Sequence, residues 1–501
     1  MKRICIVVVV LALALLGDKF YIDNTSHPDS SDNLAQVIID SCLYERSVDI
    51  SQFRASPEEV TSLVDSLRAD GLLPWYTDTS SSYRYDPSVG FVVEFVPETL
   101  YDGAIDKKLY EQKVAEILDA CVLDGMSQYQ IALAIHDYLV VNSYYDETLI
   151  KRSGYDLLVN GSAVCSGYAA AYQDLLSRTG ITSVCVTSEA MSHMWNLVKI
   201  DGQWYHVDVT WDDPTPDVNG QASHDYFLLT DNEISSGEEP HLGWASEFSC
   251  ENTRFSNAYW RGVYSQICFV SKDTCYLLRS RDCVNSIYLR SMTSGSEDLV
   301  YAEKESFVDI GAGRYRYSHQ GLSYWNGRLY FNTMDKIISM DPDGKDIEKV
   351  FTYNTKSNKK AIRGCYVSNG TTYISAADHN GNMSYFAEKI ANVDYHTHNY
   401  IETACEPSCQ EPGYTLSKCD CGLSFKSEFI ENVSHNYHLL KSKDASVGYN
   451  IFGLSSTCSM CGESAKLVLT KPAIKEWVSD NYLVVILVWV GGFWLLLRKK
   501  D

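Results

Sequence analysis

Residues 160–214 read NGSAVCSGYAAAYQDLLSRTGITSVCVTSEAMSHMWNLVKIDGQWYHVDVTWDDP, and this stretch decides the fold that we predict for the centre of the chain. It offers, in order, a thiol at Cys165, an imidazole at His193 and a carboxylate at Asp208. Small residues precede Cys165 and helically spaced apolar residues follow it, which predicts a helix that begins at the thiol. The N–H groups and positive dipole at a helix start favour a thiolate. The stretch therefore predicts a cysteine nucleophile.

A hairpin is predicted next, because Asp201-Gly202 is a two-residue turn signal between strands at 194–200 and 203–210. With Ile200 facing Gln203, Asp208 and His193 lie on one face, as diagonal neighbours within reach of each other. Asp208 can then orient His193, and His193 can take the proton of the thiol. The sequence thus predicts a site made of Cys165, His193 and Asp208.

Two more residues are expected to support this site. His206 shares the face of Asp208 on the same predicted strand. Trp195 is expected to cover the His193–Asp208 pair, although plain core packing is an equal alternative. Upstream, His136-Asp137 lies within a helix predicted over residues 128–141, where we expect a packed, hydrogen-bonded pair rather than a catalytic one. The following segment, 144–160, is expected to be a loop that leads to Cys165.

Three blocks of the central stretch, AVCSGYAAAY, SHMWNLV and WYHVDVTWDDP, resemble the motif blocks of the transglutaminase-like domain, a papain-like fold. The match is specific in residue type, order and spacing, and it covers residues 107–244. The upstream text AIHDYLVVNSYYD is typical of bacterial members. The resemblance implies a triad of Cys165, His193 and Asp208 that works through a thioester intermediate and needs no cofactor. The acyl group then passes to water, as in a peptidase or amidase, or to an amine, as in a crosslinking enzyme.

Composition limits the partners of the chain. Its 501 residues exceed what one hydrophobic core usually supports, so we expect several domains. The formal net charge is −23, and such an acidic surface repels phosphate backbones, which excludes nucleic acid as an expected partner. A protein or peptide substrate at the cell surface is expected instead.

Both ends of the chain predict export and membrane attachment. Residues 1–17 carry Lys2 and Arg3 and then an apolar run, as a signal peptide does. Residues 482–497 are apolar without a charge and are followed by a basic tail. We predict one transmembrane helix there, with the basic tail inside and the bulk of the chain outside the cell membrane.

The remaining regions complete a multidomain architecture. We expect an N-terminal α+β region at 18–106, the α+β papain-like, transglutaminase-like domain at 107–260 and an all-β region at 263–392. The all-β region reads as consecutive Tyr-rich hairpins that resemble propeller blades, although the span is short for a closed propeller. A small Cys-rich, ribbon-like module is expected at 396–465.

The Cys-rich module contains a weak internal repeat, in which His398-Asn-Tyr and His435-Asn-Tyr each precede a pair of cysteines followed by Gly. Paired cysteines with upstream histidines fit structural zinc. The expected ligands are Cys419, Cys421, Cys458, Cys461 and His435. Outside the cell, disulfides are the alternative, for example between Cys405 and Cys409.

Together these patterns predict a membrane-tethered cysteine enzyme at the cell surface. The alternative from another class is a surface adhesion or wall-binding protein whose catalytic-looking domain is inert. In that case the β-rich and Cys-rich modules carry the function.

Overall fold

The structure is a computed structural model of the chain. It describes residues 30–69, 72–74, 76–77, 82–98, 104–237, 239–304, 307–311, 313–390, 398–430, 433, 437–438, 455–458 and 464–466. One compact unit comprises Ser31–Cys405 and Tyr414–Phe429, and the rest of the chain is assigned to a second unit. The predicted signal peptide at 1–17 and transmembrane segment at 482–497 lie outside the described residues. Among the described helices, none is long and apolar enough to cross a membrane.

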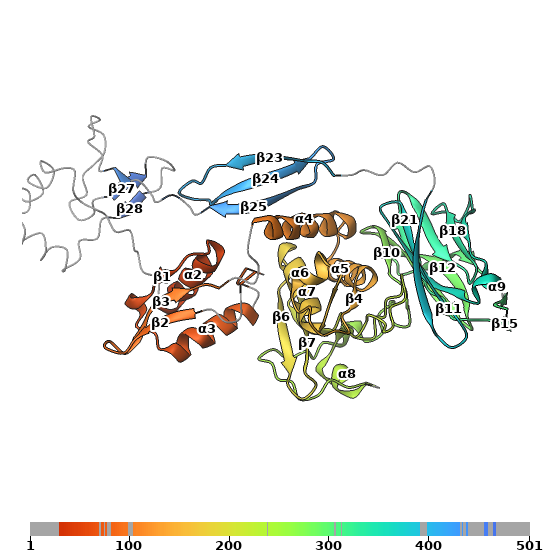
Figure 1. The fold of residues 1–501 in the computed structure, drawn as a ribbon, viewed down its shortest axis with the longest axis horizontal. Helices are drawn as coiled ribbons and strands as arrows, with labels where there is room; N and C mark the ends of the chain where they lie inside the picture. The colour runs from red at the N-terminus through yellow and green to blue at the C-terminus, as the bar shows by residue number, and fades with distance from the viewer. Residues whose placement is uncertain are drawn as a thin grey trace, which may run out of the picture. The chain divides into compact units, whose positions relative to one another are not determined.

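The N-terminal region is a small α+β fold with its own core (Figure 1). Its strands form an antiparallel sheet of order β1-β3-β2, and its helices are amphipathic. Pro57 begins α3, and Ser56 and Glu59 cap each other's backbone N–H groups. The elements are α2 (Ser30–Leu43), β1 (Val48–Asp49), α3 (Pro57–Ala69), β2 (Ser82–Asp86) and β3 (Phe91–Val96).

The central region packs helices against one antiparallel sheet of order β6-β7-β8-β9. Its helices are α4 (Ala104–Cys121), α5 (Gln128–Asn142), α6 (Gly154–Leu158), α7 (Cys165–Arg178) and α8 (Asp231–Ser236). Its strands are β4 (Tyr144–Tyr145), β5 (Ser162–Ala163), β6 (Ser183–Ser188), β7 (His193–Ile200), β8 (Gln203–Val207) and β9 (Phe227–Leu229). One hydrophobic core joins α5 and α7 to β7 and β8.

Helix α5 has more buried residues than the other helices of this region. A capping box of Ser127 and Gln130 begins it. The sequence predicts one apolar stripe, but ten of its residues are buried, on all sides of the helix. The structure explains this because α5 contacts α4, α7 and the chain that enters the β-rich region.

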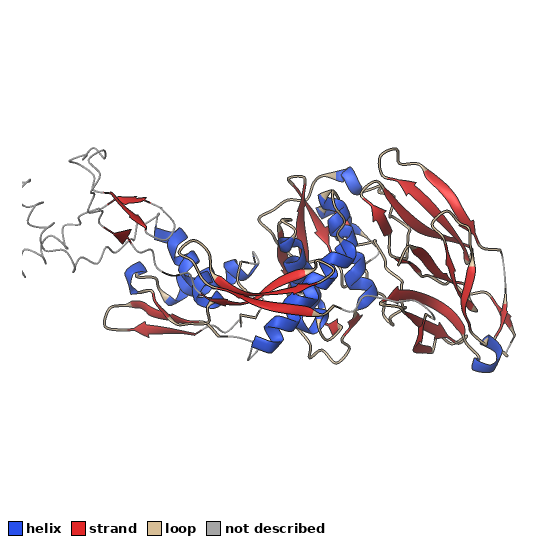
Figure 2. Ribbon diagram, turned by 90° about the horizontal axis from the view of Figure 1, so that it is seen from above, coloured by secondary structure: helices blue, strands red, loops and turns tan. Residues whose placement is uncertain are grey.

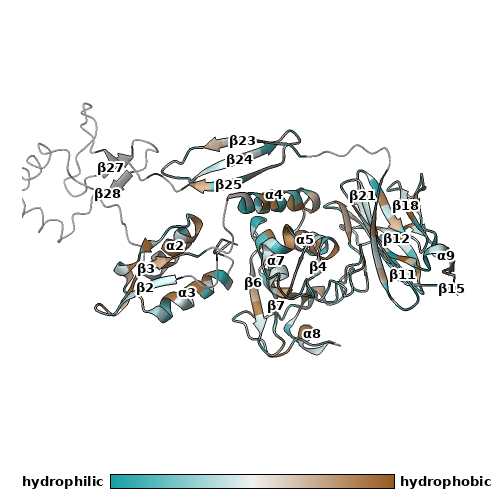
Figure 3. Ribbon diagram, in the orientation of Figure 1, coloured by the Kyte–Doolittle hydropathy of each residue, from teal (hydrophilic) through white to brown (hydrophobic). Residues whose placement is uncertain are grey.

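In Figure 3, α4 carries hydrophilic and hydrophobic residues side by side, as expected of a helix with one buried face.

The hairpin of β7 and β8 has the predicted register. Ile200 pairs with Gln203, and the ladder continues to Asn196 and Val207. Asp201 has φ 50 and Gly202 has φ 82, the left-handed conformations that a two-residue hairpin turn of this type needs. Strand β8 ends at Val207, so Asp208 lies just beyond the ladder, where its backbone N–H donates to the Tyr226 carbonyl.

The β-rich region consists of consecutive antiparallel meanders (Figure 2). The sheets have the orders β10-β11-β12-β13, β14-β15, β16-β17-β18-β19 and β20-β21-β22. Their strands are β10 (Cys268–Ser271), β11 (Thr274–Arg281), β12 (Val284–Ser291), β13 (Glu297–Ala302), β14 (Val308–Asp309), β15 (Arg314–Tyr315), β16 (Leu322–Trp325), β17 (Arg328–Asn332), β18 (Lys336–Met340), β19 (Glu348–Thr352), β20 (Ala361–Ser368), β21 (Thr371–Ala377) and β22 (Met383–Lys389). Helix α9 (Thr355–Asn358) interrupts them.

The Cys-rich segment contributes two short sheets. The first is antiparallel from β23 (Tyr400–Cys405) to β24 (Gly413–Cys419) and is completed by β25 (Ser424–Ile430). The second consists of β26 (Tyr437–His438), β27 (Ser455–Cys458) and β28 (Ser464–Lys466).

Candidate active site

Cys165 is the first residue of α7, the position that the sequence predicts. The segment before it is ordered by β4 and β5, which pair in parallel, so the expected loop at 144–160 is wrong in part. Helix α6 also lies in that segment, begun by a capping box of Ser153 and Asp156. Gly167 allows the close approach, because a Cβ there would lie 2.4 Å from the Cβ of Ala163. The helix start is thus held at a fixed place beside β5.

His193 and Asp208 meet as the hairpin register predicts. His193 Nε2 lies 2.5 Å from Asp208 Oδ2, and both side chains are buried. The other carboxylate oxygen, Oδ1, accepts hydrogen bonds from the backbone N–H groups of Thr210 and Trp211. Because Nε2 is engaged by Asp208, the imidazole has Nδ1 left for its contact with the Cys165 thiol. The structure therefore brings all three predicted residues together.

The electrostatics of Cys165 and His193 favour a thiolate beside an imidazolium. Partial burial raises the pKa of the Cys165 thiol, but the hydrogen bond and charge of His193 and two backbone N–H groups outweigh it, so the pKa lies below its usual value. Burial lowers the pKa of His193, whereas hydrogen bonds to Asp208 and Cys165 raise it to about 9. The two shifts have opposite signs, as an ion pair requires.

His241 is a further member of the site that sequence reasoning missed. Its Nε2 lies 2.7 Å from Asp208 Oδ2, the same oxygen that His193 contacts. His241 is fully buried, and its Nδ1 has no hydrogen-bond partner among the described residues. The proton of the imidazole is therefore assigned to Nε2, where it is donated to the carboxylate. Burial raises the pKa of Asp208, but the hydrogen bonds from His193 and His241 hold it below its usual value.

Trp195 and His206 form a chain beside the site. The Trp195 ring stacks on His193 with ring centroids 5.7 Å apart, and its indole N–H donates to His206 Nδ1 at 3.0 Å. His206 Nε2 lies 2.9 Å from Asp231 Oδ1. Since indole can only donate, Nδ1 is the acceptor and Nε2 carries the proton. Burial lowers the pKa of His206 to about 4, in spite of Asp231, so His206 is neutral near neutral pH.

His136 and Asp137 belong to a buried network apart from the thiol, as expected. His136 Nδ1 lies 2.8 Å from Asp137 Oδ1, and its Nε2 lies 3.1 Å from Asp212 Oδ2. Asp137 also contacts His224 and accepts the backbone N–H of Ile267. These bonds connect α5 to the segment after Asp208 and to the start of the β-rich region. The network is structural.

A sequence profile described as the transglutaminase-like superfamily core matches residues 116–209. That range contains Cys165, His193 and Asp208 in the order and setting described above. The chain has a transglutaminase-like core. No curated protein sequence matches the chain significantly.

Solved structures with detectable similarity are distant. A structure titled "Crystal structure of a TGase" is 12% identical with a TM-score of 0.21, and the alignment covers 36% of this chain and 57% of that one. A europium-containing methanol dehydrogenase is 11% identical with a TM-score of 0.18, covering 34% of this chain and 24% of that one. A putative TolB from Agrobacterium tumefaciens is 12% identical with a TM-score of 0.19, covering 50% and 92%. The chain thus spans less than two thirds of the length of the first two proteins.

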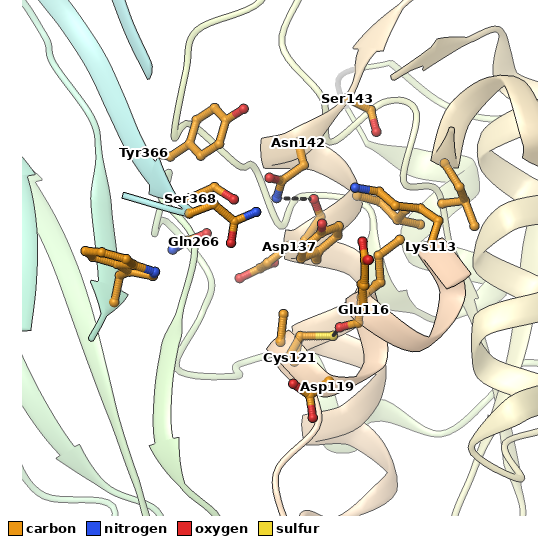
Figure 4. Close-up of a pocket in the computed structure, with 18 of the residues that line it drawn as sticks. Lys113, Glu116, Asp119, Cys121, Asp137, Asn142, Ser143, Gln266, Tyr366 and Ser368 are labelled. Atoms are coloured by element: carbon orange, nitrogen blue, oxygen red, sulfur yellow. Dashed lines mark hydrogen bonds between the residues drawn. The ribbon is translucent and has the colours of Figure 1, made fainter. Parts of the chain in front are cut away.

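A cavity of about 850 Å³ lies between the transglutaminase-like core and the β-rich region (Figure 4). Lys113, Glu116 and Asp119 of α4 line one side, and Gln266, Tyr366 and Ser368 line it from the β-rich region. Cys165, His193 and Asp208 do not line it. This cavity is therefore separate from the thiol of the transglutaminase-like core.

The predicted metal ligands have different outcomes. Cys419 and Cys421 lie close together, and His398, which is not among the expected ligands, lies beside them. Cys461 and His435 lie outside the described residues, and for Cys458 only the backbone is described, at the end of β27. The Cys405 thiol, named above in the disulfide alternative, contacts the Thr403 carbonyl.

Proposed function

We propose that the transglutaminase-like core is a cysteine enzyme that forms a thioester at Cys165 and passes the acyl group to water or to an amine. The single observation that carries this proposal is the connected chain of Cys165, His193 and Asp208 at the start of α7. A cysteine with only a structural role does not need an imidazole and a carboxylate beside it. Cys185, for comparison, is half-buried on β6, and burial raises the pKa of its thiol to about 12.

Each step of the reaction has a residue for it. The Cys165 thiolate attacks the acyl carbon of a peptide or carboxamide, and the carbonyl oxygen takes up the negative charge. When the intermediate collapses, the C–N bond breaks and imidazolium His193 gives its proton to the leaving amine or ammonia. His193, again neutral, then takes a proton from water or from an acceptor amine, which attacks the thioester and releases Cys165.

Backbone N–H groups at the start of α7 are the donors that we assign to the oxyanion. Val164 is the N-cap residue and makes no side-chain cap, and the Ser166 N–H is one of two backbone groups that hydrogen-bond the Cys165 thiol. Asp208 stays charged throughout and orients His193 with Nδ1 toward the thiol. No metal or cofactor takes part in these steps.

The substrate is a protein or peptide at the cell surface, and the chain is held at the cell membrane by segment 482–497. This part of the proposal is supported by the apolar segment, the basic tail and the signal-like start of the sequence. The competing proposal is a surface adhesion or wall-binding protein with an inert core. The cavity in Figure 4 is lined by both aromatic and amide side chains. This lining favours the adhesion or wall-binding protein.

Product analysis separates these functions. Full-length protein is incubated with a cell-surface protein extract, with and without a labelled primary amine, and the peptides are analysed by mass spectrometry beside the Cys165→Ala variant. New peptide termini or deamidated side chains indicate transfer to water, and amine adducts indicate transfer to an amine. No product beyond that of Cys165→Ala contradicts the enzyme and favours the adhesion protein.

A further inference from the structure

The hairpin of β23 and β24 brings a histidine and two cysteines together. Tyr400 pairs with Cys419 in the antiparallel ladder. When this register is continued by two residues, His398 falls opposite Cys421. His398 Nδ1 lies 3.4 Å from Cys421 Sγ, and one ligand atom of each of His398, Cys419 and Cys421 lies within 4.8 Å of the others.

The turn after β24 places the thiols of Cys419 and Cys421 close to each other. The Gly422 N–H donates to the Cys419 carbonyl at 2.9 Å, and the Cys419 N–H donates to the Leu423 carbonyl at 2.8 Å. Gly422 has φ 103, a conformation that other residues adopt only with strain. This tight return places two thiols, two residues apart, beside the imidazole. Two sulfur atoms and one imidazole nitrogen are donors that zinc prefers.

We propose that His398, Cys419 and Cys421 bind one zinc ion. This set differs from the ligands expected from the sequence, which are Cys419, Cys421, Cys458, Cys461 and His435. Here a single repeat supplies three ligands from one hairpin and its turn. Zinc is four-coordinate, so the fourth position is taken by water or by a group outside the described residues. The proposal does not rest on the function of the transglutaminase-like core.

We expect a metal ion to stabilise residues 398–430 because this segment buries few apolar side chains. None of the hydrophobic clusters found among the described residues includes a residue of 398–430. Small modules without a hydrophobic core are commonly stabilised by metal ions or disulfides. A zinc ion here fixes the start of β23 to the turn between β24 and β25. Zinc binding then contributes to the folding of the module.

The second repeat has the same backbone register at the corresponding residues. Tyr437 pairs with Cys458, as Tyr400 pairs with Cys419. In both repeats the tyrosine follows the histidine by two residues, and the paired cysteine is the first of its pair. In each repeat the histidine therefore lies two residues before the tyrosine that pairs with the first cysteine. This agreement indicates that the arrangement is a property of the repeat.

The test measures zinc in the full-length chain. Protein purified with reduced thiols is stripped with a chelator, reloaded with zinc chloride and analysed for zinc per chain by mass spectrometry. Cys421→Ser and His398→Ala are each expected to lose one equivalent, and the double variant is expected to lose no more than either alone. Cys405→Ser, at the other end of β23, is the matched control and retains the full zinc content.

Cobalt provides a readout that needs no variant. Cobalt(II) in place of zinc in the unaltered chain is expected to give the intense spectrum of a tetrahedral ion with thiolate ligands, which alkylation of the exposed Cys421 abolishes. An unchanged zinc content in Cys421→Ser and His398→Ala overturns the proposal. So does an octahedral cobalt spectrum, or a disulfide at Cys419 or Cys421 in the freshly isolated chain.

Discussion

His241 Nε2 and Asp208 Oδ2 lie 2.7 Å apart, although 33 residues separate them in the sequence. The contact gives the carboxylate a second imidazole donor on the oxygen that faces His193. His241 touches neither the thiol nor its proton, so it is a positioning residue. It limits where the carboxylate of Asp208 can turn, and it competes with His193 for the negative charge.

Replacing His241 by Ala is expected to slow the alkylation of Cys165 by roughly 10²-fold at neutral pH, because misplacement of a catalytic group by about 1 Å has that effect. His241→Gln keeps an N–H donor and is expected to restore most of the rate. The second readout is the pH profile, which moves in His241→Ala because Asp208 then interacts with His193 alone. The positioning role is supported if the pH profile of alkylation moves in a His241→Ala protein that retains its fold. An unchanged profile would mean that the role of His241 is only structural.

Asp208→Asn removes the charge that stabilises imidazolium at His193. The pKa of His193 is then expected to fall from about 9, and the imidazolium–thiolate pair becomes about tenfold less populated for each unit of that fall. The check is the pKa of His193 measured by NMR of a labelled chain, together with the alkylation rate. An unchanged His193 titration in Asp208→Asn would show that the carboxylate does not control the imidazole.

Product formation is expected to fall at both ends of the pH range. On the acid side, protonation removes the thiolate, and this limb lies below the usual thiol pKa because His193 lowers that of Cys165. On the alkaline side, His193 loses the proton for the leaving group near pH 9. The apparent pKa values of the acid and alkaline limbs belong to Cys165 and His193 as a coupled pair. A profile that keeps rising above pH 9 would remove His193 as the general acid.

The buried network of His136 predicts a loss of stability in alkali. Burial lowers the pKa of His136, but its hydrogen bonds to Asp137 and Asp212 raise it to about 9, above the unfolded value near 6.5. A raised pKa stabilises the fold below about 6.5, and that contribution is lost as the pH rises through 9. Denaturant unfolding across this range measures it.

His136→Gln is the matched variant for that experiment. It is expected to lower the free energy of unfolding by about 1–3 kcal/mol at neutral pH, because a buried carboxylate loses a donor. The difference between the two proteins should shrink as the pH rises above 9. A constant difference at all pH values would mean that His136 is not charged in the folded protein.

The parts of the site that the sequence predicts correctly depend on local signals. The start of α7 at Cys165 follows from small residues before the thiol and periodic apolar residues after it. The register of β7 and β8 follows from Asp201-Gly202, since a two-residue turn leaves one pairing. The meeting of His193 with Asp208 is a consequence of that register.

The parts that the sequence does not reveal depend on tertiary folding. His241 lies in a segment without periodicity, and it reaches Asp208 only because that segment folds back on β6, where Ser188 bonds the Leu242 carbonyl and bridges to Trp244. Helix α6 was missed because five residues show no helical period, although its capping box can be read at Ser153 and Asp156. The pairing of His398 with Cys421 needs the register of β23 and β24, for which no short turn supplies a signal.

The reactivity of Cys165 reports directly on whether the thiol is activated by His193. The full-length chain is treated with iodoacetamide over a range of pH, and the alkylation of each cysteine is followed by peptide mass spectrometry, with Cys165→Ala and His193→Ala as controls. We predict that Cys165 reacts faster than the partly exposed Cys283 at neutral pH, and that His193→Ala removes this advantage. Equal rates for Cys165 and Cys283, unaffected by His193→Ala, would show that Cys165 is an ordinary thiol and not a nucleophile activated by His193.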